Sequence, residues 1–200
     1  MKRLSETINS FPSFIGSWNI ENNNLCEEII SFFDDHPELH TRGQVSSGID
    51  EEIKKKTDLP ILPNDLTKPE YYIIKEYIKN LYECYDDYMN IWPFLKKHIN
   101  DIDIGTFQIQ KYNPGDHFQK IHSERTTISD SHRILVWMTY LNSVDDGGNT
   151  FFENYDLKIK PVQGKTLIWP AEWTHSHSGE VLKSGVKYII TGWMNFPYTR

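Results

Sequence analysis

The sequence predicts a mainly β domain with α-helices in its N-terminal half, and three observations support this class. After about residue 100, short segments of alternating apolar and polar residues are separated by glycine-containing turns, a pattern typical of an all-β sandwich or jelly roll. Before residue 100, apolar residues recur at helical spacing. Aromatic residues make up 14% of the chain, and strands accommodate large flat side chains well. We therefore expect a single domain over residues 1–200, in which a helical support region (1–100) packs outside a β core (101–200).

The first helix is predicted to begin directly after Asn24, its N-cap, and to end near His36-Pro37. Asparagine is a favourable N-cap residue, and Glu27 and Glu28 would lie in the first turn, near the positive end of the helix dipole. Residues 1–22, which precede it, contain proline, glycine and an asparagine cluster, so we expect an irregular segment or an edge strand.

The second helix is predicted to have Pro69 in its first turn and to stop at Trp92-Pro93. Its apolar face extends from Tyr72 to Met89. The polar stretch Thr41–Pro63 between the two helices shows little periodicity and has room for one or two short strands.

The β core is predicted from six segments bounded by turn residues. The strand candidates are Thr106–Tyr112, Ile134–Leu141, Thr150–Phe152, Leu157–Lys160, Thr166–Trp169 and Val186–Met194.

Charge and composition exclude several broad classes. A net charge of −7 argues against a protein built mainly to bind nucleic acid, because phosphate binding depends on clustered lysine and arginine. No apolar run approaches the roughly 20 residues of a membrane span, and the N-terminal residues do not resemble a signal peptide. Cys26 and Cys84 are far apart, so we expect reduced thiols and a cytoplasmic protein.

Two histidine motifs predict a metal site. His122 and Glu124 are two residues apart, which would place both on one face of an extended segment. His175 and His177 have the same spacing, and either could supply a second imidazole. Two imidazoles and one carboxylate form a facial triad, which holds iron(II) and leaves coordination positions open.

Lys187 is predicted to be the anchor of an anionic co-substrate. It lies in the apolar strand Val186–Met194, where a charge is costly unless it is paired. Alternation puts Lys187, Ile189, Thr191 and Trp193 on one face. Tyr140 could assist through its phenol, and an ordinary core position for Tyr140 is the competing interpretation.

The order of these motifs over residues 106–195 resembles the catalytic domain of the 2-oxoglutarate- and Fe(II)-dependent dioxygenases, and in particular its prolyl-4-hydroxylase-like branch. The matching segments are Tyr112-Asn113-Pro114-Gly115, His122-x-Glu124, Leu141-Asn142-x-Val144-x-Asp146-Gly147-Gly148-x-Thr150-x-Phe152, Ile159-Lys160-Pro161-x-x-Gly164-x-x-Leu167-Ile168-Trp169, and His177-x9-Lys187-Tyr188-x4-Trp193. The resemblance implies a double-stranded β-helix, a form of jelly roll, with N-terminal helices bracing one sheet.

The resemblance also implies roles for single residues. His122, Glu124 and His177 would bind Fe(II), Lys187 would pair with the distal carboxylate of 2-oxoglutarate, and Tyr140 would assist. The family spacing of ten residues before the basic anchor selects His177 over His175. The implied reaction consumes 2-oxoglutarate and O2, releases succinate and CO2, and hydroxylates an unactivated C–H, with a peptidyl proline as the favoured substrate and ascorbate as a stimulant.

Glu124 departs from the family pattern, which usually has aspartate at this position. This departure supports one alternative, a non-catalytic jelly-roll binding protein with a relic metal site. A second alternative, a zinc hydrolase, leaves Lys187 without a role and lacks a His-Glu-x-x-His helix.

Overall fold

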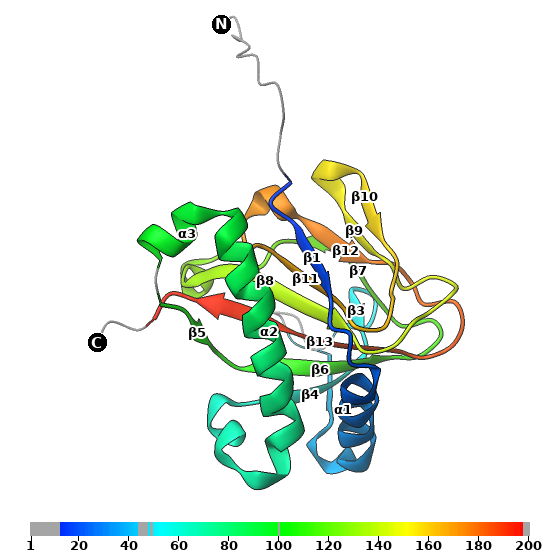
Figure 1. Ribbon diagram of the computed structural model, residues 1–200. Helices are drawn as coiled ribbons and strands as arrows, with labels where there is room; N and C mark the ends of the chain where they lie inside the picture. The colour runs from blue at the N-terminus through cyan, green and yellow to red at the C-terminus, as the bar shows by residue number, and fades with distance from the viewer. Residues whose placement is uncertain (1–12, 44–47, 49, 100, 198–200) are drawn as a thin grey trace, which may run out of the picture.

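Thirteen strands of the described residues form two antiparallel sheets that pack face to face (Figure 1). The computed structural model describes residues 13–43, 48, 50–99 and 101–197, so the expectation for residues 1–12 lies outside the described residues. The larger sheet has the order β1 (Gly16–Asn19), β11 (Lys165–Pro170), β8 (Arg133–Tyr140), β13 (Lys187–Asn195), β6 (Phe107–Tyr112), β4 (Thr57–Ile61) and β2 (Thr41–Arg42), and β5 (Asp103–Ile104) pairs with β13. The smaller sheet has the order β10 (Leu157–Ile159), β9 (Thr150–Phe152), β12 (His177–Gly179), β7 (His117–His122) and β3 (Lys54–Lys55). The predicted jelly-roll class with N-terminal helices is confirmed.

The central strand β8 separates two apolar layers because its side chains alternate between the faces of the larger sheet. Leu135 and Trp137 pack toward the helices, whereas Val136, Met138 and Tyr140 pack between the two sheets. A strand covered on both faces is apolar throughout, which explains the nearly continuous apolar run of β8.

The helices α1 (Asn23–Asp35) and α2 (Tyr72–Ile91) cover the outer face of the larger sheet (Figure 1). Helix α1 begins two residues earlier than predicted, because its N-cap is Asn22, whose side chain accepts a hydrogen bond from the Leu25 amide at 3.1 Å. The predicted cap was wrong because the side-chain amide of Asn24 donates to Glu28 instead.

The end of α2 at Trp92 was predicted correctly, but a short helix α3 (Pro93–His98) follows directly. Proline is well tolerated at a first helical position, because the N–H that it lacks would have no partner there. Pro93 therefore ends one helix and begins another.

The described residues of the segment Thr41–Pro63 form three short strands, one more than the upper expectation. Strand β4 extends the larger sheet beside β6, whereas β3 extends the smaller sheet beside β7. The chain therefore passes from one sheet to the other at Lys56, which lies between these strands. Residues of the first half thus contribute edge strands as well as helices, and the division at residue 100 remains a prediction.

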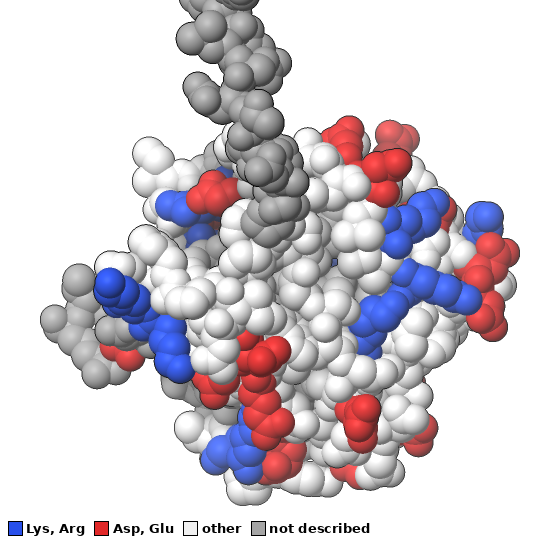
Figure 2. Space-filling model, turned by 45° about the horizontal axis from the view of Figure 1, so that its top comes forward, with Lys and Arg blue, Asp and Glu red and all other residues white. Residues whose placement is uncertain are grey.

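Both cysteines are buried free thiols, and burial raises the pKa of each to about 11. Among the described residues, no helix is both long enough and apolar enough to cross a membrane. Acidic and basic side chains are interspersed on the face shown in Figure 2, with wide uncharged areas between them.

Candidate active site

The structure brings His122, Glu124 and His177 together between the two sheets. His122 ends β7, His177 begins β12, and the two residues lie directly opposite each other in this antiparallel pair, with their ring centroids 4.5 Å apart. The possible ligand atoms of the three residues all lie within 4.8 Å of one another. Two imidazoles and one carboxylate at this spacing are the donor set of a 2-His-1-carboxylate iron(II) site.

The backbone orients both imidazoles toward the centre of the cluster. The Nδ1 atom of His122 lies 2.8 Å from the carbonyl of Lys120, and Nδ1 of His177 lies 3.0 Å from the carbonyl of His175. A carbonyl only accepts hydrogen bonds, so each Nδ1 carries the proton and each Nε2 keeps a lone pair. Both Nε2 atoms face Glu124 Oε1, at 3.4 and 3.5 Å.

Glu124 lies two residues beyond the end of β7, so the prediction that it shares a strand face with His122 was wrong. Two hydrogen bonds hold it in place from the larger sheet. Trp193 Nε1 donates to Glu124 Oε2 at 3.0 Å, and Arg133 donates to the Glu124 carbonyl at 2.8 Å. The Arg133 guanidinium also stacks 3.9 Å above the Trp193 ring. The longer side chain is thus fixed by partners on β8 and β13 rather than by strand geometry.

Glu124 is ready to bind a cation as a carboxylate. Burial on its own would raise its pKa, but His122 and His177, when their rings are protonated, donate hydrogen bonds to the carboxylate and lower its pKa well below 4.5. The residues present therefore fit a divalent metal.

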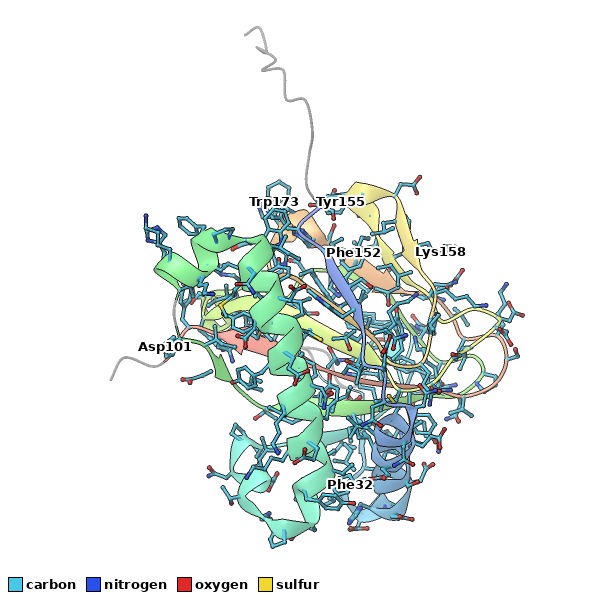
Figure 3. All side chains as sticks on the ribbon, viewed as in Figure 1. Phe32, Asp101, Phe152, Tyr155, Lys158 and Trp173 are labelled. Atoms are coloured by element: carbon cyan, nitrogen blue, oxygen red, sulfur yellow. The ribbon has the colours of Figure 1, made fainter. Side chains whose placement is uncertain are left out.

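His175 does not belong to this cluster. It lies in a short 3-10 turn (Trp173–His175), so it does not share an extended face with His177 as expected. Its Nε2 atom is 2.8 Å from the Ser13 carbonyl and 3.2 Å from the Tyr155 hydroxyl. Tyr155 and Trp173 mark this end of the molecule in Figure 3. The choice of His177 over His175 as the metal-binding candidate therefore agrees with the geometry.

A cavity of about 250 Å³ adjoins the three residues. Lys187, Ile189, Thr191 and Trp193 all line it, as the alternation of β13 predicts. His122, Glu124 and His177 line it as well, so a small molecule in the cavity can touch both the metal ligands and Lys187.

Lys187 is 3% exposed, and it forms no ion pair with a carboxylate of the described residues; its Nζ donates to the Gly148 carbonyl at 2.9 Å. The ammonium also lies 4.2 Å from the Tyr112 ring centroid. Burial lowers the pKa of Lys187 to about 8, and Glu180 offsets only part of this effect. A buried cation of this kind is a strong site for a carboxylate.

The glycine pair of the Asp146-Gly147-Gly148 motif shapes this end of the cavity. Both glycines have positive φ, +78° and +67°. A Cβ atom at Gly147 would come within 2.2 Å of the Val181 carbonyl, and one at Gly148 would approach the Lys187 side chain to 3.2 Å. The motif therefore gives Lys187 its room and its backbone acceptor.

Tyr140 lies behind the cavity wall. Its hydroxyl donates to Thr150 Oγ1 at 2.6 Å, and Thr150 lines the cavity whereas Tyr140 does not. Tyr112, to which we assigned no role from the sequence, lines the cavity beside Lys187. The register of β6 against β13 pairs these two residues, a signal that depends on strand pairing rather than on local sequence. A direct contact of Tyr140 with a co-substrate remains a prediction.

Comparisons with known proteins point to one family. The family model described as "2OG-Fe(II) oxygenase superfamily" matches residues 107–195. One relative is a protein of Acanthamoeba polyphaga mimivirus, whose name provisionally assigns it to the prolyl 4-hydroxylases. It is 25% identical over an alignment of 197 residues, and the alignment covers 88% of this chain and 71% of the relative.

Two solved structures share the fold. The viral collagen prolyl hydroxylase of Paramecium Bursaria Chlorella virus-1, in complex with 2-oxoglutarate, superposes with a TM-score of 0.65 at 17% identity, over 92% of this chain and 97% of that chain. A prolyl hydroxylase of Trichoplax adhaerens, bound to a hypoxia inducible factor peptide fragment, superposes with a TM-score of 0.70 at 15% identity, over 92% and 84%.

Proposed function

The chain belongs to the 2OG-Fe(II) oxygenase superfamily, and on this premise we propose that it hydroxylates a prolyl residue of a peptide or protein substrate. The observation that carries the oxygenase assignment is the convergence of His122, Glu124 and His177 in the same cavity as the buried cation Lys187. Support for the prolyl substrate comes from the relatives, which are named for this reaction, and from the neighbour with a bound peptide.

Each group of the cavity has a distinct task in this proposal. Iron(II) held by the three residues would supply the activation of O2, with 2-oxoglutarate oxidised to succinate and CO2 and one oxygen atom added to the substrate C–H. The two Nε2 lone pairs and the Glu124 carboxylate bind the metal, and Lys187 binds the distal carboxylate of the co-substrate. Fixing both ends of the co-substrate fixes its orientation toward the substrate.

Aromatic side chains limit access of water to the metal ligands. Phe118 stacks on His122 with ring centroids 3.9 Å apart. Phe152 and Trp169 lie 5.6 and 5.2 Å from the His177 ring, and Phe152, which is labelled in Figure 3, is fully buried. Excluding water strengthens the charge interactions of the site and limits side reactions.

The decisive experiment measures succinate formed from 2-oxoglutarate in air, with Fe(II) and ascorbate, together with the mass of proline-containing peptides. We expect iron-dependent succinate and peptides that gain one oxygen atom. His177→Ala should abolish both, and His175→Ala is the matched control, because its ring binds Ser13 and Tyr155 instead of the cluster.

The outcomes test the oxygenase activity and the prolyl substrate separately. Succinate formation without any modified prolyl peptide would leave an oxygenase with a different substrate. Iron-loaded protein that neither binds 2-oxoglutarate nor forms succinate would favour a non-catalytic jelly-roll protein. A cytoplasmic location remains a prediction from the two distant thiols.

A further inference from the structure

Lys56 is a second buried cation of the cavity, separate from Lys187. It lies where the chain passes from β3 in the smaller sheet to β4 in the larger sheet, and it lines the cavity. Lys56 is 6% exposed, and its side chain is fully buried. Its Nζ forms an ion pair with Asp58 Oδ1 at 2.6 Å.

The ion pair with Asp58 leaves the ammonium incompletely satisfied. An ammonium group has three N–H donors, and among the described residues Asp58 is the one side chain that forms an ion pair with Lys56 Nζ, through a single oxygen atom. Burial lowers the pKa of Lys56 to about 7 although Asp58 opposes this effect, so the pair compensates only part of the desolvation. Unsatisfied buried donors are costly, and a ligand carboxylate would satisfy them.

Positive charge is concentrated on this edge of the cavity. Lys54 also lines the cavity, with its Nζ 4.8 Å from the Phe118 ring centroid, whereas Lys55 points outward and lies 3.5 Å from Asp116. Among the described lining residues Glu124 is the only acidic one, and its charge is assigned to the metal. In a chain of net charge −7, lysines gathered at one cavity edge mark a place for an anion.

The co-substrate does not need this position. One carboxylate of 2-oxoglutarate is assigned to the metal and the other to Lys187. A third negative group must therefore come from the other substrate. We propose that Lys56, supported by Asp58, binds an acidic side chain of the peptide substrate, so that the enzyme acts on prolines with a neighbouring glutamate or aspartate. This inference rests on the proposed function.

The test uses proline-containing peptides that are identical except for Glu, Gln or Lys at one position flanking the proline. Peptide binding is measured without O2 on protein loaded with Fe(II) and 2-oxoglutarate, and oxygen addition is measured by mass in air. We expect wild type to bind the Glu peptide about tenfold or more tightly than its Gln counterpart, and the Lys peptide most weakly. The Glu/Gln ratio is compared within each variant, so it does not depend on the amount of folded protein.

The variants test Lys56 itself. Lys56→Met should reduce the Glu/Gln ratio to within about twofold. Asp58→Asn, which releases the ammonium from its internal partner, should raise the ratio above that of wild type. Because removing one member of a buried pair can unfold a protein, the double variant Lys56→Met/Asp58→Asn provides a second test of the lost preference. Lys55→Met is the matched control and should keep the ratio of wild type.

Several results would overturn the inference. The first is equal binding of the Glu and Gln peptides by wild type, and the second is an unchanged Glu/Gln ratio in Lys56→Met. The third is a loss of 2-oxoglutarate affinity in Lys56→Met as large as that in Lys187→Met, because this loss would assign Lys56 to the co-substrate. Preferential binding of the Glu peptide without oxygen addition would overturn the proposed reaction and leave the acidic anchor standing.

Discussion

Replacing Lys187 by methionine should raise the stability of the ligand-free protein and weaken the binding of 2-oxoglutarate. Methionine fills a similar volume without the charge, so the substitution tests the ammonium rather than the packing. In the protein without ligands, the buried ammonium is a cost, because burial lowers its pKa from 10.5 to about 8. That difference corresponds to about 3 kcal/mol of destabilisation near neutral pH.

Removing the ammonium relieves this cost, but part of the gain in stability is lost with the contacts that the ammonium makes. Lys187 Nζ donates to the Gly148 carbonyl at 2.9 Å and lies 4.2 Å from the Tyr112 ring. The hydrogen bond contributes about 1 kcal/mol and the cation–π contact about 1 kcal/mol. Lys187→Met should therefore stabilise the ligand-free protein by roughly 1 kcal/mol, a rise of about 2–4 °C in Tm for a chain of this size.

The effect on 2-oxoglutarate should be much larger and of opposite sign. Removing one partner of a buried charge pair costs about 2–5 kcal/mol, or roughly 30-fold to several thousand-fold in Kd. The assay is an anaerobic titration of the Fe(II)-loaded protein with 2-oxoglutarate, combined with thermal unfolding of the ligand-free protein. Lys183→Met, which removes an exposed lysine paired with Asp146, is the control.

The reasoning would be refuted by a variant that is less stable without ligand and binds 2-oxoglutarate as well as wild type does. Such a protein would show that Lys187 holds the fold together rather than the co-substrate. Weaker 2-oxoglutarate binding by Lys183→Met than by wild type would instead reveal long-range charge effects on the assay.

Three further predictions concern the same cavity. Raising the pH from 7 to 9 should weaken 2-oxoglutarate binding with a midpoint at or above about 8, because only the protonated Lys187 attracts a carboxylate. Lys187→Arg should remove this pH dependence, and a 2-oxoglutarate affinity of wild type that does not change with pH would contradict the prediction. As the pH rises from about 8 to 10.5, the ligand-free protein should become more stable, because Lys187 in the unfolded chain still holds the proton that the folded state has lost. Measuring the free energy of unfolding at several pH values, for wild type and for Lys187→Met, checks this prediction. Trp193→Phe removes the 3.0 Å hydrogen bond to Glu124 Oε2 and should weaken Fe(II) binding about 10- to 100-fold in a competition titration, whereas unchanged affinity would show that Arg133 alone positions the carboxylate.

The sequence predicts those features of the fold that depend on local pattern. The two long helices and the apolar strands appear where periodicity places them, and the alternation around Lys187 identifies the face of β13 that lines the cavity. Strands β7 and β12 were not among the predicted segments. Strand β12 has only three residues, and β7 has three exposed residues in succession, so neither shows an apolar alternation.

The features that the sequence does not predict depend on which strands become neighbours. Glu124 reaches His122 and His177 from a loop because Arg133 and Trp193 hold it there, and Trp193 is far along the chain. Lys56 lies in a polar segment without periodicity, and only the crossing from β3 to β4 places it in the wall of the cavity. A local pattern carries no information on either arrangement.

The site joins the two sheets, which has a consequence for stability. His122 and His177 belong to the smaller sheet, whereas Lys187 belongs to the larger one, and Glu124 is held from the larger sheet by Trp193. Metal and co-substrate together would therefore bridge the sheets across the cavity. Because a ligand that binds only the folded state stabilises it by about 2.7 kcal/mol at 100 times its Kd, the bridge offsets the cost of keeping Lys187 buried. A cation that destabilises the empty fold and stabilises the loaded one favours folding with the co-substrate in place.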